Sequence, residues 1–336
     1  MNQKPRILIT MGDVAGVGPE IIVKAWDEIL AFCDPVVVGD PAWLEKAIHL
    51  INKNAKVQVI NEPEQATPLP NLISCANIKT ADLSTVKIRD INASAGKAAH
   101  DYLIQSIDWA LQKRATAIVT APLHKEGLHL AGLDYPGHTE ILASRTKAPE
   151  HVMILALPEL AVAHVTLHLA LRNVFDELSI ERIVARAQLL TNLLTKVLGR
   201  TPRIALAALN PHGSDGGLFG KEEQTIIQPA ANICKQQGMT VSGPIPADTL
   251  FLRASQGEFD GVVAMYHDQG HIPIKLLGMH RAVNITLGLP LVRTSVAHGT
   301  AFDIVGKGLA DPSSMLAAID VAVRLVEADY GRRGKS

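Results

Sequence analysis

Short apolar runs alternate along this chain with longer stretches in which apolar residues recur at every third or fourth position. The short runs have the length of β-strands, and several are apolar almost throughout, which is typical of parallel strands buried on both faces. The longer stretches, such as residues 95–114 and 179–198, have the spacing of amphipathic helices. The runs that predict strands cover residues 6–10, 35–39, 57–60, 117–122, 151–157, 160–168, 203–211, 261–267 and 282–288.

This alternation predicts an α/β fold with helices on both faces of mostly parallel sheets. At 336 residues the chain is long for one hydrophobic core, so we expect two α/β/α domains with a cleft between them. One domain is predicted to combine residues 1–125 with 290–336, and the other to cover residues 126–289. Ligands of such folds bind beyond the carboxyl ends of the strands, and we expect the site there.

Composition narrows the class of protein. The chain has 47% hydrophobic and 19% charged residues, as an ordinary globular protein does, and its net charge of −1 predicts no nucleic-acid partner. Its three cysteines, Cys33, Cys75 and Cys234, are too widely spaced to indicate a disulfide framework or a thiolate zinc site. No stretch resembles a signal peptide or a membrane span, so we expect a cytoplasmic protein without a membrane partner.

Residues 264–312 concentrate charged and hydrogen-bonding side chains among apolar residues and glycines. Folding requires the apolar part of this run, but it does not require so many polar groups at strand ends and turns. Because such a pattern lowers stability and is typical of an active site, we interpret the chain as an enzyme.

Three histidines, His168, His212 and His267, are each predicted to lie at or just after the end of a separate apolar strand. Three imidazoles gathered from three strand ends can bind one divalent metal ion and leave positions open for substrate. The alternative is that they are hydrogen-bonded histidines at the rim of a cleft. His164 and His271 are further candidates, so spacing alone does not fix the ligand set.

Two turns precede predicted helices and have residues suited to an anion. Residues 10–20 form a glycine-rich turn with Pro19 in the first helical turn, and this segment either lines the cleft or is a tight turn required for packing. Residues 136–140 place His138 and Thr139 near a helix start, where they suit a phosphate. Thr139 as a simple helix cap is the interpretation that spacing favours.

The segment that begins at His298 is more specific. Residues 298–312, HGTAFDIVGKGLADP, resemble the adenosine-binding loop of the β-decarboxylating dehydrogenases of isopropylmalate and isocitrate. A carboxylate at Asp303 can accept hydrogen bonds from both ribose hydroxyls and repels a 2′-phosphate, which favours NAD over NADP. The resemblance therefore predicts a cofactor loop made by His298, Gly299, Thr300 and Asp303.

Over nearly its full length the chain resembles the PdxA family, the 4-hydroxythreonine-4-phosphate dehydrogenases. The variants at residues 121–132 (APLHKEGLHLAG), 267–275 (HDQGHIPIK) and 298–304 look more like the family branch that oxidises 4-phospho-D-threonate or 4-phospho-D-erythronate than like the vitamin B6 enzymes. The motifs that carry the family resemblance are ITMGDVAGVGPEI, TAPLHKEGL, YPGHTE, LNPHGSDGGLFGKEE, GPIPADTLF, AMYHDQG, VNITLGLPLVRTS and HGTAFDI.

The resemblance implies an isopropylmalate-dehydrogenase-like fold, NAD as cofactor, one divalent metal ion per site (Zn, Mg or Co) and a homodimer. It places the metal ligands at His168, His212 and His267, with His267 supplied by the other subunit. The domain of residues 126–289 would then carry these ligands and the dimer contacts. The implied substrate contacts are His138, Thr139, Lys275, Asn284 and Arg293.

The implied reaction is oxidation of the C3 alcohol of a four-carbon 4-phosphorylated acid, followed by loss of carbon dioxide. From 4-phospho-D-threonate it gives dihydroxyacetone phosphate, and from 4-phosphohydroxy-L-threonine it gives 3-amino-2-oxopropyl phosphate. Lys275, Asp248 and Lys125 are the candidate acid and base, because each lies in a matching motif near a strand end. Asp248 could equally cap a helix, and Lys125 could be a solvated surface residue.

One position departs from the family pattern. Ala297 stands before His298 where the family usually has an aspartate. This departure makes a second rival plausible, a catalytically silent paralogue that only binds a phosphorylated acid; the first rival is the vitamin B6 substrate.

Overall fold

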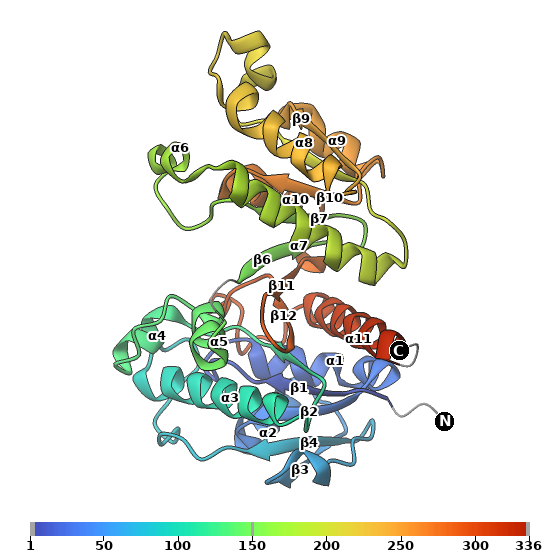
Figure 1. Ribbon diagram of the computed structural model, residues 1–336. Coiled ribbons are helices and arrows are strands. Elements are labelled where there is room, and N and C mark those ends of the chain that lie inside the picture. The colour runs from blue at the N-terminus through green and yellow to red at the C-terminus, as the bar shows by residue number, and fades with distance from the viewer. Residues whose placement is uncertain (1–3, 149–150, 334–336) are drawn as a thin grey trace. The chain divides into compact units, whose positions relative to one another are not determined.

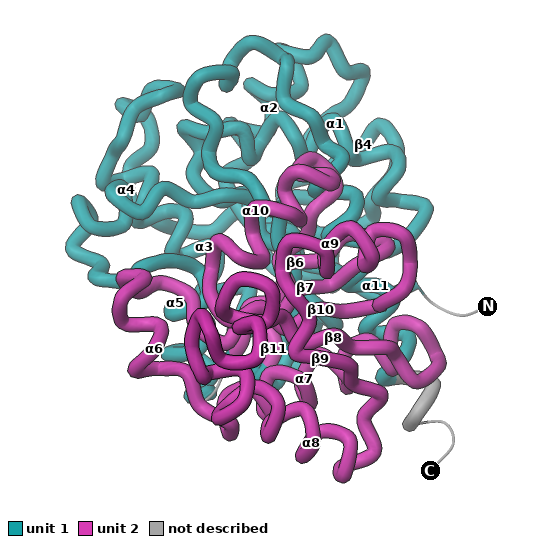
Figure 2. Tube along the Cα trace, turned by 90° about the horizontal axis from the view of Figure 1, so that it is seen from above, with its two compact units in different colours: residues 1–151, 288–336 teal, residues 152–287 magenta. Residues whose placement is uncertain are grey.

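The computed structural model describes residues 4–148 and 151–333. The chain divides into two compact units, which Figure 2 shows in different colours. Unit 1 comprises residues 1–151 together with 288–336, and unit 2 comprises residues 152–287.

Unit 1 is built on a parallel sheet in the strand order β3-β4-β2-β1-β5-β12. Since all these strands run in one direction, their carboxyl ends and the turns that follow lie along one edge of the sheet. The strands are β1 (Arg6–Thr10), β2 (Asp34–Gly39), β3 (Lys56–Ile60), β4 (Leu72–Asn77), β5 (Ala117–Thr120) and β12 (Val292–Val296).

The helices of unit 1 pack in two groups. The first comprises α1 (Gly18–Phe32), α2 (Pro41–Leu50) and α11 (Ser313–Arg333), and the second comprises α3 (Ala93–Leu111), α4 (Lys125–Leu130) and α5 (His138–Thr146). The connections β1–β2 and β4–β5 run in opposite directions across the sheet, and right-handed crossovers therefore place α1 and α3 on opposite faces (Figure 1). The local sequence favours the N-termini of α1 and α3 where they are observed. Pro19 lies in the first turn of α1, and the Asn92 side chain caps α3.

The first break between the units lies at residue 151, whereas the sequence predicted it at residue 125. The reason is that α4 and α5 pack on α3 of unit 1. Leu128 and Ile141 share one buried cluster there with Leu103 and Ile107. The segment that carries His138 and Thr139 consequently belongs to unit 1.

Unit 2 has a mixed sheet in the order β11-β6-β7-β10-β8-β9, in which β6 runs antiparallel to both β11 and β7. Its strands are β6 (Val152–Ala156), β7 (Ala161–His164), β8 (Ile204–Ala207), β9 (Val241–Ile245), β10 (Gly261–Ala264) and β11 (Val283–Leu287). Its α-helices are α6 (Val174–Glu177), α7 (Ile180–Leu198), α8 (Gln228–Gln236), α9 (Ala247–Ser255) and α10 (His267–Gly278). The helix pairs α7–α8 and α9–α10 pack together within each pair.

The α/β class with mostly parallel strands is confirmed, and every predicted strand run contains a strand. The sequence missed β4, β9 and β12. In β9, Gly243 and Pro244 are residues that disfavour strands, and β4 and β12 contain polar positions that interrupt the apolar run. Among the helices of the described ranges, none is long and apolar enough to cross a membrane.

Candidate active site

Three turns meet at the carboxyl edge of the unit 1 sheet, after β1, β5 and β12. The backbone N–H of Val17 donates to the Thr300 carbonyl at 3.0 Å, and that of Asp13 donates to the Pro122 carbonyl at 2.8 Å. A Cβ added at Gly16 would lie 2.9 Å from the Thr300 Cβ, so this position requires glycine for close approach. The glycine-rich turn therefore supports the predicted cofactor loop through direct contacts.

The cofactor loop is folded back on itself. His298 Nδ1 lies 2.8 Å from the Gly299 carbonyl oxygen, and Thr300 is buried. The Phe302 ring stacks on His124 with a centroid distance of 5.1 Å. Asp303 is exposed, so its carboxylate is accessible to the hydroxyls of a ribose.

Arg293 is the buried cation of unit 1. It lies on β12 with 3% of its surface exposed, and its Nη2 donates to Thr120 Oγ1 at 2.6 Å. Burial lowers the pKa of Arg293 to about 10, against the opposing effect of Glu140, so the guanidinium stays charged at neutral pH. Burial, together with the nearby Arg293, holds the pKa of His138 well below its ordinary value. A charged guanidinium beside a neutral imidazole suits recognition of a phosphate or carboxylate.

The start of α5 corrects one prediction. The helix begins at His138 and its N-cap position is Gly137, so Thr139 lies in the first turn and does not cap the helix. Lys125 is the first residue of α4 and is exposed, and its side chain lies near Gly137. The structure therefore brings His138, Thr139, Arg293 and Lys125 into one region of unit 1.

Asp13 is a buried carboxylate that the sequence reasoning missed. Its Oδ1 accepts from the Ala15 N–H at 2.9 Å, whereas Oδ2 is buried without a hydrogen-bond partner. Burial raises the pKa of Asp13 to about 6, although the Ala15 hydrogen bond opposes the shift. The signal that could have found it is an acidic residue directly after an apolar strand, inside a glycine-rich turn.

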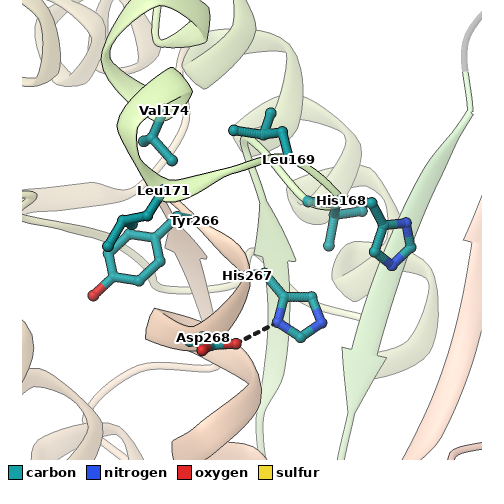
Figure 3. Close-up of a pocket in the computed structure, with 8 residues that line it drawn as sticks. His168, Leu169, Leu171, Val174, Tyr266, His267 and Asp268 are labelled. Atoms are coloured by element: carbon teal, nitrogen blue, oxygen red, sulfur yellow. Dashed lines mark hydrogen bonds and ion pairs between the residues drawn. The ribbon is translucent and has the colours of Figure 1, made fainter.

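In unit 2, His168 and His267 lie side by side, with ring centroids 5.9 Å apart (Figure 3). They line one cavity of about 350 Å³ together with Leu171, Tyr266 and Asp268. Neither histidine ends a strand as predicted, because β7 ends at His164 and β10 ends at Ala264. His168 lies in the loop after β7, and His267 is the first residue of α10.

His267 is held by its neighbours. Its Nδ1 lies 2.6 Å from Asp268 Oδ1, and its ring stacks on His271 with a centroid distance of 3.8 Å. His271 Nδ1 in turn lies 3.1 Å from Nε2 of the buried His164. Burial lowers the pKa of His271 to about 4, so its ring is neutral at neutral pH. The sequence reasoning did not assign Asp268, although its adjacency to His267 was a signal.

These contacts fit a metal-binding imidazole. A histidine that ligates a metal usually donates its other ring N–H to a carboxylate, which fixes the tautomer and the ring direction. Asp268 occupies that position at Nδ1, and Nε2 of His267 is then the nitrogen that can ligate a metal ion. His164 and His271, the further candidates, face each other through their ring nitrogens.

His212 lies in the turn after β8, where its ring meets Phe219 edge-on at a centroid distance of 6.4 Å. Within residues 4–148 and 151–333, no group of three or more His, Cys, Asp or Glu side chains is close enough to hold a metal ion. One chain thus brings His168 and His267 together, but it does not bring His212 to them.

The remaining predicted residues are spread over unit 2. Lys275 lies on α10 and is exposed. Asp248 is also exposed and lies in the first turn of α9, whose N-cap position is Pro246, so the helix-cap alternative for Asp248 is wrong. Asn284 is half-buried on β11, opposite Leu155 of β6.

Comparison with known proteins shows what this chain is similar to. The family profile described as pyridoxal phosphate biosynthetic protein PdxA matches residues 31–322. D-threonate 4-phosphate dehydrogenase of Cupriavidus necator is 44% identical over 321 residues, which cover 94% of this chain and 95% of that protein. The 4-hydroxythreonine-4-phosphate dehydrogenase of Desulforapulum autotrophicum is 43% identical over 324 residues, which cover 96% of this chain and 95% of that protein.

The fold is shared with solved structures of the same kind. A 4-hydroxythreonine-4-phosphate dehydrogenase from Klebsiella pneumoniae superposes with a TM-score of 0.86 at 42% identity. The match covers 97% of this chain and 99% of that one.

Proposed function

This chain belongs to the PdxA family of dehydrogenases, and from that premise we propose that it oxidises and decarboxylates a four-carbon 3-hydroxy acid 4-phosphate, using NAD and a divalent metal ion. The proposed substrate is 4-phospho-D-threonate, which gives dihydroxyacetone phosphate and carbon dioxide. The observation that carries the proposal is the buried, charged Arg293 beside His138, in the unit that also carries the predicted cofactor loop.

Recognition of the substrate is assigned to residues that suit its two anionic ends. Arg293 offers a charged guanidinium, and the first turn of α5 offers the His138 imidazole and the Thr139 hydroxyl. Lys275 and Asn284 are the further substrate contacts in this proposal. Because the Arg293 guanidinium is hydrogen-bonded to Thr120, its position is fixed before the substrate binds. Less side-chain conformational entropy is therefore lost on binding.

The cofactor assignment rests on the loop after β12. Asp303 is exposed and would accept hydrogen bonds from the ribose hydroxyls, while His298, Gly299 and Thr300 form the surrounding loop. A negative charge at Asp303 disfavours a 2′-phosphate, so the proposal specifies NAD and not NADP.

The metal ion is assigned to His168, His212 and His267. When bound, NAD would supply the acceptor for the C3 hydride, and the metal ion held by these histidines would supply a Lewis acid for the C3 oxygen. Asp268 holds His267 in the tautomer that presents Nε2. The proton of the C3 hydroxyl is assigned to Lys275 Nζ, the Asp248 carboxylate or Lys125 Nζ, and the fall in kcat of Lys275→Met, Asp248→Asn and Lys125→Met identifies which of them acts.

We propose further that a second copy of the chain completes the metal site. Large apolar side chains are exposed beside the histidines of unit 2, which is typical of a surface that another subunit covers. Leu171 and Phe175, which follow His168, are 63% and 50% exposed, and Leu218 beside Phe219 is 74% exposed.

The test is a side-by-side assay of NADH absorbance with NAD, a divalent metal ion and one of two substrates. Turnover of 4-phospho-D-threonate supports the proposal. The second candidate, 4-phosphohydroxy-L-threonine, is favoured by the relative from Desulforapulum autotrophicum, and its exclusive turnover would reassign the substrate. Binding of either compound without NADH formation would indicate the silent paralogue and direct attention to Ala297.

A further inference from the structure

The turn that carries His212 has a strained backbone. Five consecutive residues from His212 to Gly216 have positive φ, at 55°, 70°, 65°, 48° and 72°, which makes a short left-handed turn. His212, Ser214 and Asp215 bear side chains, for which this conformation is unfavourable. Strained backbone persists only where surrounding contacts impose it, so we expect contacts in or next to this turn that stabilise it.

Glu223 holds the two residues that directly precede the turn, Leu209 and Asn210. Its Oε1 accepts from the backbone N–H groups of Leu209 at 2.8 Å and Asn210 at 2.7 Å, and its Oε2 accepts from Asn210 Nδ2 at 2.9 Å. The Glu223 side chain is almost fully enclosed, with 3% of the residue exposed. Hydrogen bonds to an ionised carboxylate are stronger than neutral ones, and burial protects them from water.

The surrounding chain is shaped around this network. Asn210 Nδ2 also donates to Glu222 Oε2 at 2.6 Å. A Cβ added at Gly220 would lie 2.5 Å from Asn210 Nδ2, so glycine is required there. Glu223 itself begins a π-helical turn, Glu223–Ile227, which precedes α8. Such turns are uncommon and often lie at functional sites.

We infer that Glu223 is the positioning residue for His212: its carboxylate fixes the two residues before the left-handed turn and thereby fixes where the imidazole points. This inference rests on the proposed function in treating His212 as a metal ligand. Glu223 does not touch substrate, cofactor or metal in this account. It acts through the backbone of Leu209 and Asn210 and through the Asn210 side chain.

The test compares Glu223→Gln with the full-length wild-type protein in two measurements. Hydrogen exchange reports the protection of the Leu209 and Asn210 amides and of residues 212–217, and titration with Co²⁺ reports metal affinity. In Glu223→Gln an amide NH₂ faces the Asn210 NH₂ group, and the charge is lost. We expect faster exchange in this segment and an affinity for Co²⁺ that is weaker by about tenfold or more.

Two further variants separate positioning from general stability. Gly220→Ala disturbs Asn210 without removing a charge, and it should reproduce both effects. Glu258→Gln removes a glutamate of unit 2 that pairs with Arg253, and it should change neither measurement. Unchanged exchange in Glu223→Gln, or unchanged Co²⁺ affinity despite faster exchange, would overturn the inference. A wild-type protein that binds no Co²⁺ would instead contradict the metal assignment of the proposed function, and its exchange data would still decide whether Glu223 holds the turn.

Discussion

The central cation of the candidate site in unit 1, Arg293, is buried and anchored within one chain, whereas the candidate metal ligands of unit 2 lie near its surface. Arg293 is 3% exposed and bonded to Thr120, but His168 and His212 are exposed. Unit 1 thus fixes the proposed anion-binding guanidinium by its own packing. Unit 2 orients His267 through Asp268 and, by our inference, His212 through Glu223, but it does not bring His212 to the other two histidines.

The largest effect is expected for His212→Ala, which breaks the unit 2 side of this comparison. Loss of one of three proposed ligands should abolish stoichiometric metal binding and lower kcat/KM by about 1,000-fold. The fold should stay intact, because His212 is exposed. Metal content after dialysis and the far-ultraviolet circular dichroism spectrum check both points.

His280→Ala is the matched control, because His280 is an exposed histidine of the same unit outside the proposed site. It should retain metal and activity. Unchanged metal content in His212→Ala would refute the ligand assignment.

The next largest effect is expected for Arg293→Ala on the unit 1 side. Removal of a buried guanidinium that binds an anion should raise the KM for the phosphorylated acid by about 100-fold and leave the KM for NAD nearly unchanged. Arg145→Ala, which removes an exposed arginine paired with Asp108, should leave both constants unchanged. A larger rise for NAD than for the acid would contradict the substrate role.

Asp13→Asn tests how much the burial of a charged carboxylate lowers the stability of unit 1. The folded pKa of Asp13, about 6, lies above its ordinary value of 3.8, so the folded state binds this proton more tightly than the unfolded state. Stability should therefore fall as pH rises from about 4 to about 6, by roughly 3 kcal/mol at neutral pH. Asn keeps the acceptor for Ala15 and carries no charge, so the variant should be more stable near pH 7 and gain nothing near pH 4.

Thermal unfolding across this pH range checks the prediction. Asp134→Asn, at an exposed aspartate of the same unit, is the control. A variant that is less stable than wild type at every pH would show that the Asp13 charge is compensated in the folded protein.

The smallest effect is expected for Asp303→Asn in the cofactor loop. Loss of the carboxylate should reduce the preference for NAD over NADP by about tenfold, through weaker ribose binding and less repulsion of a 2′-phosphate. The ratio of kcat/KM for the two cofactors measures this. An unchanged ratio would exclude Asp303 as the ribose ligand.

The sequence predicted the elements with continuous apolar runs because burial on both faces leaves a simple pattern. It missed β9, where Gly243 and Pro244 conceal the strand, and it extended the strand runs to His168 and His267. Those histidines lie beyond the strands because the chain turns at residues whose apolar character continues the run.

Site residues with a local motif were predictable, and those defined by distant contacts were not. His298 to Asp303 stand in a contiguous motif, whereas Thr120 becomes part of the site only because β5 pairs with β12 beside Arg293. Glu223 and Asp13 carry roles that depend on burial, which one sequence does not display.

The most direct test of whether a second subunit completes the metal site is to mix two histidine variants that are each inactive alone. We propose that His168 and His212 of one subunit join His267 of the other, as the family resemblance implies. The rival arrangement joins His168 and His267 of one chain, whose rings lie 5.9 Å apart, to His212 of the other. Under our proposal, a mixture of His168→Ala and His267→Ala chains, unfolded and refolded together, should recover roughly a quarter of wild-type NADH production, because half of the dimers are mixed and each has one complete site. A mixture of His168→Ala and His212→Ala should recover none. Recovery only in the second mixture, or in neither, would contradict a metal site that a second subunit completes through His267.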